Sequence, residues 1–196
     1  ALAGVWALVL DGIWSSREAA RLEARRTAGN FARAFEEHSL RTLRSVDVVA
    51  LEIKRQVERQ GFDLDLQRLW SGLSLDPALF INAVLSDAQG QVVRSTSPMP
   101  AGPSVNLADR EHVRVHATRD SGEAFIGKPL KVRVAQRPAF VLTRRINAPD
   151  GSYAGVVGVA IDPSYFSSFY GQVNLGEQSV VALAGPSDLN TLSATS

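Results

Sequence analysis

Asp109 and Arg110 are the adjacent residues with the clearest capacity for binding chemistry. An arginine guanidinium is planar and permanently charged, and its paired N–H donors match the two oxygens of a carboxylate. The pair therefore predicts a site for a small anion. A structural role fits the same residues, because Asp109 can cap a short helix and Arg110 can be held by a neighbouring carboxylate. The sequence leaves both interpretations open.

Two histidines follow at a spacing that places them together. His112 and His116 are four residues apart in a segment expected to be helical, so their side chains share one face. A zinc ion would need a third and a fourth ligand, and none is evident in the sequence, so we predict no metal site. His112 can instead hydrogen-bond a ligand or respond to pH, because an unperturbed imidazole titrates near neutrality.

Arg144 and Arg145 are consecutive residues of an expected strand, and they must therefore point to opposite faces of the sheet. One is expected to reach a binding pocket, and the other to be solvated or to bridge to a helix. The sequence does not determine which of the two faces the pocket. Arg133 and Arg137 flank an expected hairpin turn, and we interpret both as solvated.

The sequence carries no motif that indicates catalysis. Gly151, Gly155 and Gly158 lack the Gly-x-Gly spacing of a dinucleotide-binding loop and lie within an expected strand. We expect Gly155 and Gly158 to let another element pack closely against the sheet. No Gly-x-Ser-x-Gly elbow or His-Glu-x-x-His helix occurs, and cysteine is absent. We therefore predict no catalytic residue and no cofactor.

The composition limits the class of protein. The chain has 196 residues, of which 45% are apolar and 21% charged, as is typical of a globular domain and not of a disordered chain. With 21 Lys and Arg against 20 Asp and Glu, the net charge is +1, which argues against a nucleic-acid-binding protein. One compact domain, alone or with an appendage, is expected.

Residues 1–10 form an apolar run that contains Trp6 and is followed by Trp14 and Arg17. The run is about half of the roughly 20 residues that span a bilayer. Tryptophan beside an apolar run is typical of a membrane interface. We interpret residues 1–14 as the remnant of a transmembrane helix or a membrane-proximal segment. The end of a signal sequence and the start of a buried helix are the alternatives.

Residues 15–60 predict one long helix without proline, which Gly61 ends. Its apolar residues recur at steps of three and four, and the opposite face is charged. The apolar positions are Ala28, Phe31, Phe35, Leu43, Val46, Ala50, Ile53 and Val57. A helix of this length measures about 60–70 Å, more than a small domain needs, and it suits signalling and dimerisation. The alternative is two shorter helices with a break near Gly29 and Asn30.

Beyond residue 61 the pattern changes from helical to strand-like. Residues 80–85 and 91–96 predict a hairpin, with a turn at 87–90 in which Gly90 supplies a positive φ. A short helix is expected from Asn106 or Asp109 to about residue 121, and another from Asp162 and Pro163 onward. Three further strands are expected at 124–132, 139–146 and 153–161. The short turns predict an antiparallel sheet of about five strands, and therefore an α+β fold in which the long helix packs on the sheet.

Taken together, these segments resemble the PAS-like extracytoplasmic sensor fold called Cache or PDC. The resemblance is closest to the periplasmic portions of membrane-bound diguanylate cyclases and related histidine kinases. The matching stretches are residues 17–20, 30–38, 42–47, 84–90, 106–112, 125–129, 142–146 and 150–162. The resemblance implies a sensor domain at residues 61–175, with short helices over a pocket on the distal face of the sheet. It also implies flanking membrane helices, and it makes residues 176–196 a C-terminal extension. Residues 175–183 resemble the first strand of a truncated second lobe, which residues 186–196 do not continue.

The resemblance also implies a function without catalysis. We expect a periplasmic domain of an inner-membrane receptor that binds a small, anionic molecule, with a carboxylate as one candidate, and signals through helix rearrangement in a homodimer. Amino-acid-binding relatives carry Arg-x-Trp-Tyr where this chain has Arg110, Glu111, His112 and Val113, which argues against a ligand of that subclass. The candidate ligand-binding residues are Asp109, Arg110, His112, Arg144, Arg145 and Tyr153. A ligand-free dimerisation spacer and a small hydrolase are the alternatives, and the sequence identifies neither the ligand nor the output domain.

Overall fold

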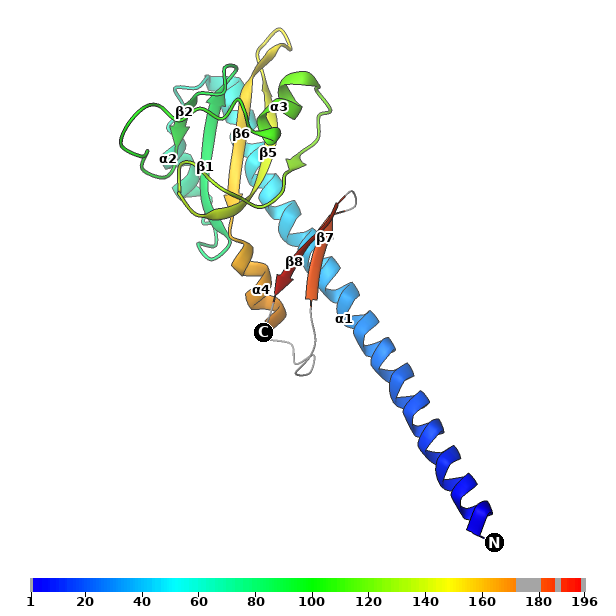
Figure 1. The fold of residues 1–196 in the computed structure, drawn as a ribbon. Coiled ribbons are helices and arrows are strands. Elements are labelled where there is room, and N and C mark those ends of the chain that lie inside the picture. The colour runs from blue at the N-terminus through cyan, green and yellow to red at the C-terminus, as the bar shows by residue number, and fades with distance from the viewer. Residues whose placement is uncertain (1, 172–180, 186–187, 195–196) are drawn as a thin grey trace. The chain divides into compact units, whose positions relative to one another are not determined.

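The computed structural model describes residues 2–171, 181–185 and 188–194 (Figure 1). The chain divides into two units, the first holding the long helix up to Arg41 and the second holding the rest of that helix together with the sheet. The helices are α1 (Leu2–Gln60), α2 (Leu66–Gly72), α3 (Glu111–Thr118) and α4 (Pro163–Gly171). The strands are β1 (Phe80–Asp87), β2 (Val92–Ser95), β3 (Phe125–Ile126), β4 (Leu130–Lys131), β5 (Pro138–Asn147), β6 (Tyr153–Ile161), β7 (Val181–Gly185) and β8 (Asp188–Ala194).

The prediction of one long helix is confirmed, because α1 continues through Gly29 and Asn30 without a break. It ends where glycine allows a left-handed residue: Gly61 has φ +81° and donates its N–H to the Val57 carbonyl at 2.7 Å. In the first unit, Phe31 and Phe35 stack with ring centroids 6.2 Å apart, and Trp14 is 76% exposed. Within the described residues, no helix combines the length and apolar character required of a membrane span.

The strands of the second unit form an antiparallel sheet in the order β2-β1-β6-β5-β3, with β4 pairing with β5 as well. This confirms the α+β prediction, with six strands in place of about five. The additional strand arises because the expected strand at 124–132 is divided into β3 and β4. Gly127 and Pro129 lie between the two, and proline has no N–H to continue a ladder.

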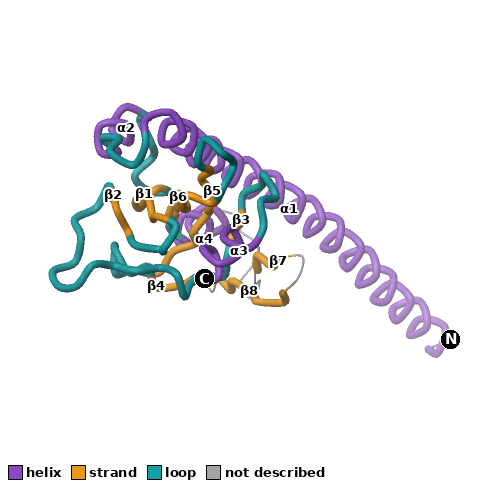
Figure 2. The backbone as a smooth tube through the Cα atoms, turned by 90° about the horizontal axis from the view of Figure 1, so that it is seen from above, coloured by secondary structure: helices purple, strands orange, loops and turns teal. Residues whose placement is uncertain are grey.

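One face of the sheet is covered by α1 from Thr42 onward, which lies behind the strands in Figure 1 and to one side of them in Figure 2. The helix buries Val46, Ala50, Ile53 and Val57, the last four positions of its predicted apolar stripe. The sheet contributes fully buried residues to this face, which are Leu85, Leu142, Val157, Val159 and Ile161. Each fully buried aliphatic side chain stabilises the fold by about 1.5–3 kcal/mol, so this layer fixes the helix on the sheet.

The opposite face is covered by α3 and by the turn between β4 and β5, which lie on the other side of the strands from α1 in Figure 2. Two hydrophobic clusters hold these elements. Leu107 and Val113, from α3 and the turn before it, pack with Val156 and Val84, and Val132 packs with Ala139, Val141 and Ala160. A space remains between the two clusters, above the middle of the sheet.

The C-terminal strands β7 and β8 pair antiparallel with each other. The sequence analysis assigned no strand to residues 188–194, whereas the structure places β8 there. A short, largely polar strand has too few alternating apolar residues to be recognised before its partner is known. The expected strand at 175–183 is described only from Val181, and residues 175–180 lie outside the described part of the chain.

Candidate ligand-binding pocket

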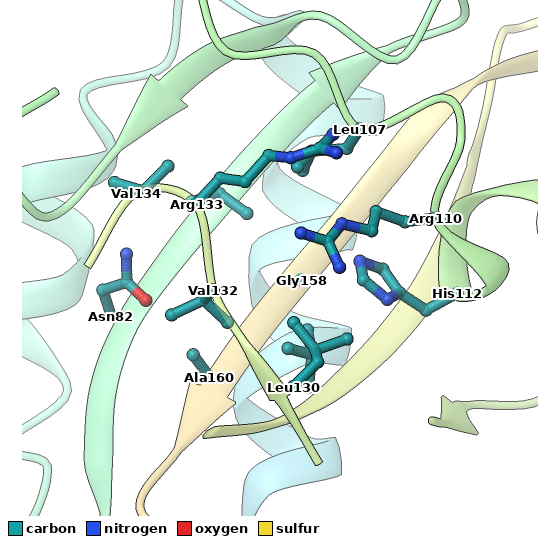
Figure 3. A pocket seen from close by; sticks show the side chains of 12 residues that line it. Asn82, Leu107, Arg110, His112, Leu130, Val132, Arg133, Val134, Gly158 and Ala160 are labelled. Atoms are coloured by element: carbon teal, nitrogen blue, oxygen red, sulfur yellow. The ribbon is translucent and has the colours of Figure 1, made fainter. Parts of the chain in front are cut away.

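A small pocket lies between the two hydrophobic clusters (Figure 3). Its floor is the middle of the sheet and is lined by Asn82, Val84, Val141, Gly158 and Ala160. Its walls come from the start of α3 and from the β4–β5 turn. The pocket encloses about 380 Å³ including its open mouth, and its enclosed interior has room for about two or three waters. Such a site suits a very small molecule.

Gly158 leaves the floor of the pocket open. It pairs with Val84 on β1 and with Thr143 on β5, at the centre of the sheet. A Cβ at this position would lie 3.4 Å from the side chains of Val84 and Val141, which is ordinary contact. The expected close approach is instead made by Gly155, where φ is +151° and a Cβ would lie 2.0 Å from the Ser86 carbonyl oxygen of the adjacent strand. The two glycines therefore have different roles, one in strand pairing and one in the pocket.

Arg110 is the N-cap residue of α3, and its backbone carbonyl accepts the N–H groups of Val113 and Arg114 at 3.1 and 3.0 Å. Its guanidinium lines the pocket beside His112 (Figure 3). Among the described residues, none forms a hydrogen bond or an ion pair with this guanidinium. In the described part of the chain, therefore, no carboxylate holds Arg110, and its charge faces the pocket.

Asp109 pairs with Arg133, which comes from the β4–β5 turn. Two parallel hydrogen bonds of 2.6 and 2.7 Å join the guanidinium to the carboxylate, and a further one of 2.5 Å joins it to the Asn106 carbonyl. The hydrogen bonds from Arg133, followed by its charge, lower the pKa of Asp109 to about 2. Asp109 therefore does not cap α3, for which no side-chain cap exists. Arg133 was expected to be solvated, but the turn folds over the sheet and makes it a neutralised part of the pocket wall.

The two histidines of α3 have separate environments. His112 lines the pocket and is 5% exposed. Burial, followed by the charge of Arg110, lowers its pKa to about 4, so the imidazole is neutral at neutral pH. His116 lies 3.0 Å from the Thr143 hydroxyl through its Nε2 and meets the ring of Phe125 edge-on. Only His112 can therefore reach a molecule in the pocket.

Arg144 and Arg145 point to opposite faces, as their adjacency predicts, but neither lines the pocket. Arg144 faces α1 and forms two hydrogen bonds of 2.5 and 2.7 Å with the Asp47 carboxylate. Arg145 lies on the other face, donates to the His116 carbonyl at 2.5 Å and stacks over the Tyr153 ring at 5.0 Å. Tyr153 in turn packs into the cluster around α3. The structure thus brings together Arg110 and His112, with Asp109 at the rim, and leaves the other three candidates outside the pocket.

Asn82 is a pocket residue that the sequence analysis missed. It is 2% exposed, its Nδ2 is buried without a hydrogen-bond partner, and its amide bonds to no described residue. The signal that could have identified it is its position two residues before Val84 on β1. Alternation places it on the same face as Val84, and asparagine is depleted in strands unless it has a specific role.

No family model matches this sequence, and no curated protein matches it either. Solved structures do match. The extracellular domain of rpHK1S-Z16, a protein named as a histidine kinase, has a TM-score of 0.64 and 29% identity, over 75% of this chain and 61% of that one. The ligand-binding domain of Mlp24 with asparagine has a TM-score of 0.61 and 11% identity, over 78% of this chain and 62% of that one.

A third structure is the ligand-binding domain of the Pseudomonas aeruginosa PAO1 amino acid chemoreceptor PctC in complex with GABA. Its TM-score is 0.56 at 11% identity, over 76% of this chain and 66% of that one. This chain thus spans about three-fifths of the length of the structures it resembles. The structures that this chain resembles are extracellular or ligand-binding domains. The chain has the Cache/PDC-type fold, as its sequence predicted, and the likeness supports a sensor role.

Proposed function

We propose that this chain is the periplasmic ligand-binding domain of a bacterial inner-membrane signalling receptor, and that it binds a small monoanion. The observation that carries the proposal is the Arg110 guanidinium, which lines the pocket without a bonded partner among the described residues. An arginine left unpaired beside an apolar pocket retains its capacity to bind a carboxylate.

The charges around the pocket support one negative charge on the ligand. Arg133 is neutralised by Asp109, and His112 is neutral because burial lowers its pKa to about 4. Arg110 therefore supplies a single uncompensated positive charge. A charge-assisted hydrogen bond contributes about 1.5–3 kcal/mol, and two are available when a carboxylate meets a guanidinium in the bidentate arrangement.

Signalling through a homodimer of α1 is part of the proposal. Exposed apolar side chains along this helix support it: Leu22 is 48% exposed, Leu40 is 47% and Val48 is 66%. A ligand acts only through its different affinities for two states of such a dimer. The output domain lies outside this sequence, and we propose a histidine kinase or a diguanylate cyclase. The 29% identity to the domain of rpHK1S-Z16 supports the former.

The proposal is tested by calorimetry and thermal shift on the purified chain with acetate, propionate, lactate, pyruvate, malonate, succinate and the common amino acids. Arg110→Gln should weaken binding of a monoanion at least tenfold, since it removes a charge-assisted bond. Arg114→Gln is the matched control, because Arg114 is exposed one turn further along the same helix. Binding that survives Arg110→Gln would contradict the proposal. A panel without any binder would favour the ligand-free dimerisation spacer.

A further inference from the structure

The pocket floor contains one polar side chain among apolar ones. Asn82 is 2% exposed, and its amide forms no hydrogen bond with the described residues. A buried amide without a partner destabilises a fold, so it persists where a bound molecule or water completes it. Figure 3 shows the side chain among the residues that line the pocket, on its β1 side.

Asn82 and Arg110 belong to opposite ends of the pocket. Arg110 begins α3, the helix held over Val84 and Val156 by one hydrophobic cluster. Asn82 pairs with Ala160, which belongs to the other cluster, under the β4–β5 turn. The floor residues beneath these two ends, Val84 and Asn82, are one two-residue step of β1 apart, or about 7 Å. One short molecule that lies along the floor can therefore meet both side chains.

We propose that Arg110 and Asn82 hold the two ends of a single short monocarboxylic acid that carries a second, uncharged oxygen, either a hydroxyl or an oxo group. This deepens the proposed function and rests on it. The carboxylate lies at the mouth beside Arg110, and the second oxygen reaches the Asn82 amide. An amide can donate to a carbonyl and both donate to and accept from a hydroxyl. Glycolate, lactate and pyruvate are small members of this class.

The same residues disfavour other ligand classes. An amino acid would bring an ammonium group, but none of the described residues that line the pocket carries a carboxylate, and Asp109 is bound to Arg133. A dicarboxylate would place a second charge on an apolar floor where only a neutral amide could meet it, which is costly. A plain fatty acid such as propionate would leave the Asn82 amide unpaired.

The decisive comparison is between lactate and propionate, which differ by one hydroxyl. In the unaltered chain we expect lactate to bind about tenfold more tightly, as one hydrogen bond to an otherwise unpaired group allows. Asn82→Leu keeps the branched shape and the number of heavy atoms and removes the amide. It should bring the ratio of the two dissociation constants close to one and leave propionate binding within about threefold. Gly158→Ala is the control, because it narrows the floor for both acids.

Each outcome decides between the two proposals. If no acid binds, or if binding is independent of Arg110, the proposed function fails and this inference fails with it. If Arg110-dependent binding is present but the lactate-to-propionate ratio is unchanged in Asn82→Leu, only this inference is overturned. Tighter binding of alanine than of lactate would also overturn it. The smaller variant Asn82→Ala repeats the ratio measurement if the leucine variant does not fold.

Discussion

Because His112 is buried in the pocket, the free energy of unfolding should depend on pH, and this dependence can be measured. Its pKa falls from 6.5 to about 4 in the folded chain, first because of burial and then because of the charge of Arg110. The folded state therefore binds fewer protons than the unfolded state between these two values. The stabilisation is fully present above pH 6.5 and is lost as the pH falls from 6.5 to 4.

The size of the effect follows from the two pKa values. The gap between 6.5 and about 4, at about 1.4 kcal/mol per pH unit, amounts to about 3 kcal/mol. About 2 kcal/mol of this is lost between pH 7.5 and pH 5. Carboxylates with lowered pKa values, such as Asp109 and Asp120, lose their contribution mainly below pH 5, because they must first reach their unfolded pKa near 3.8. The interval from pH 7.5 to 5 thus isolates the histidines.

The assay is urea unfolding at pH 7.5 and pH 5, followed by circular dichroism. The free energy of unfolding should fall with pH by about 2 kcal/mol more in the unaltered chain than in His112→Gln. His116→Gln is the comparison on the same helix, since burial lowers that pKa too while the Thr143 hydrogen bond opposes it. A difference below about 0.5 kcal/mol between the unaltered chain and His112→Gln would refute the assignment of His112 to a buried position beside the charge of Arg110.

Three further substitutions test the sheet and the charge balance. Gly155→Ala should lower the free energy of unfolding by at least about 3 kcal/mol in urea unfolding, because a Cβ would lie 2.0 Å from the Ser86 carbonyl oxygen at a φ of +151°. Gly158→Ala on the same strand should cost less than about 1 kcal/mol, and equal losses would contradict the geometry. Asp109→Asn should leave Arg133 with an uncompensated charge and strengthen binding of malonate relative to acetate by calorimetry. An unchanged ratio of the two dissociation constants would count against a neutralised Arg133.

Local patterns predicted the elements whose side chains repeat regularly. The three- and four-residue steps through Val46, Ala50 and Ile53 identify the face of α1 that the structure buries. The nearly continuous apolar run of β6 is typical of a central strand, and β6 lies between β1 and β5. The boundary between β3 and β4 was not predicted, because two-residue strands have no period of their own.

The site was less predictable, because its charges are arranged by contacts between distant residues. Asp109 and Arg133 are 24 positions apart, and Asp47 and Arg144 are 97 positions apart. The alternation of side chains along a strand predicted that Arg144 and Arg145 point to opposite faces. Which of the two faces α1 depends on the side of the sheet that the helix covers, and this is not visible in the strand itself. Asn82 was missed for a similar reason: its lack of a partner is a property of the folded surroundings and not of the strand itself.

These pairings explain why Arg110 is the residue left for a ligand. Arg133, Arg144 and Arg145 each have a bonded partner, so each would have to break existing bonds to meet an anion. Arg110 needs no such exchange, and its affinity for a carboxylate is reduced only by its own desolvation. The sheet beneath it carries Gly158 and Ala160 on the pocket face of β6 and buries Val157 and Val159 on the face that α1 covers. A packed sheet transmits small displacements from one face to the other. A ligand that draws Arg110 toward Asn82 should therefore also displace α1, which packs on the opposite face of β6.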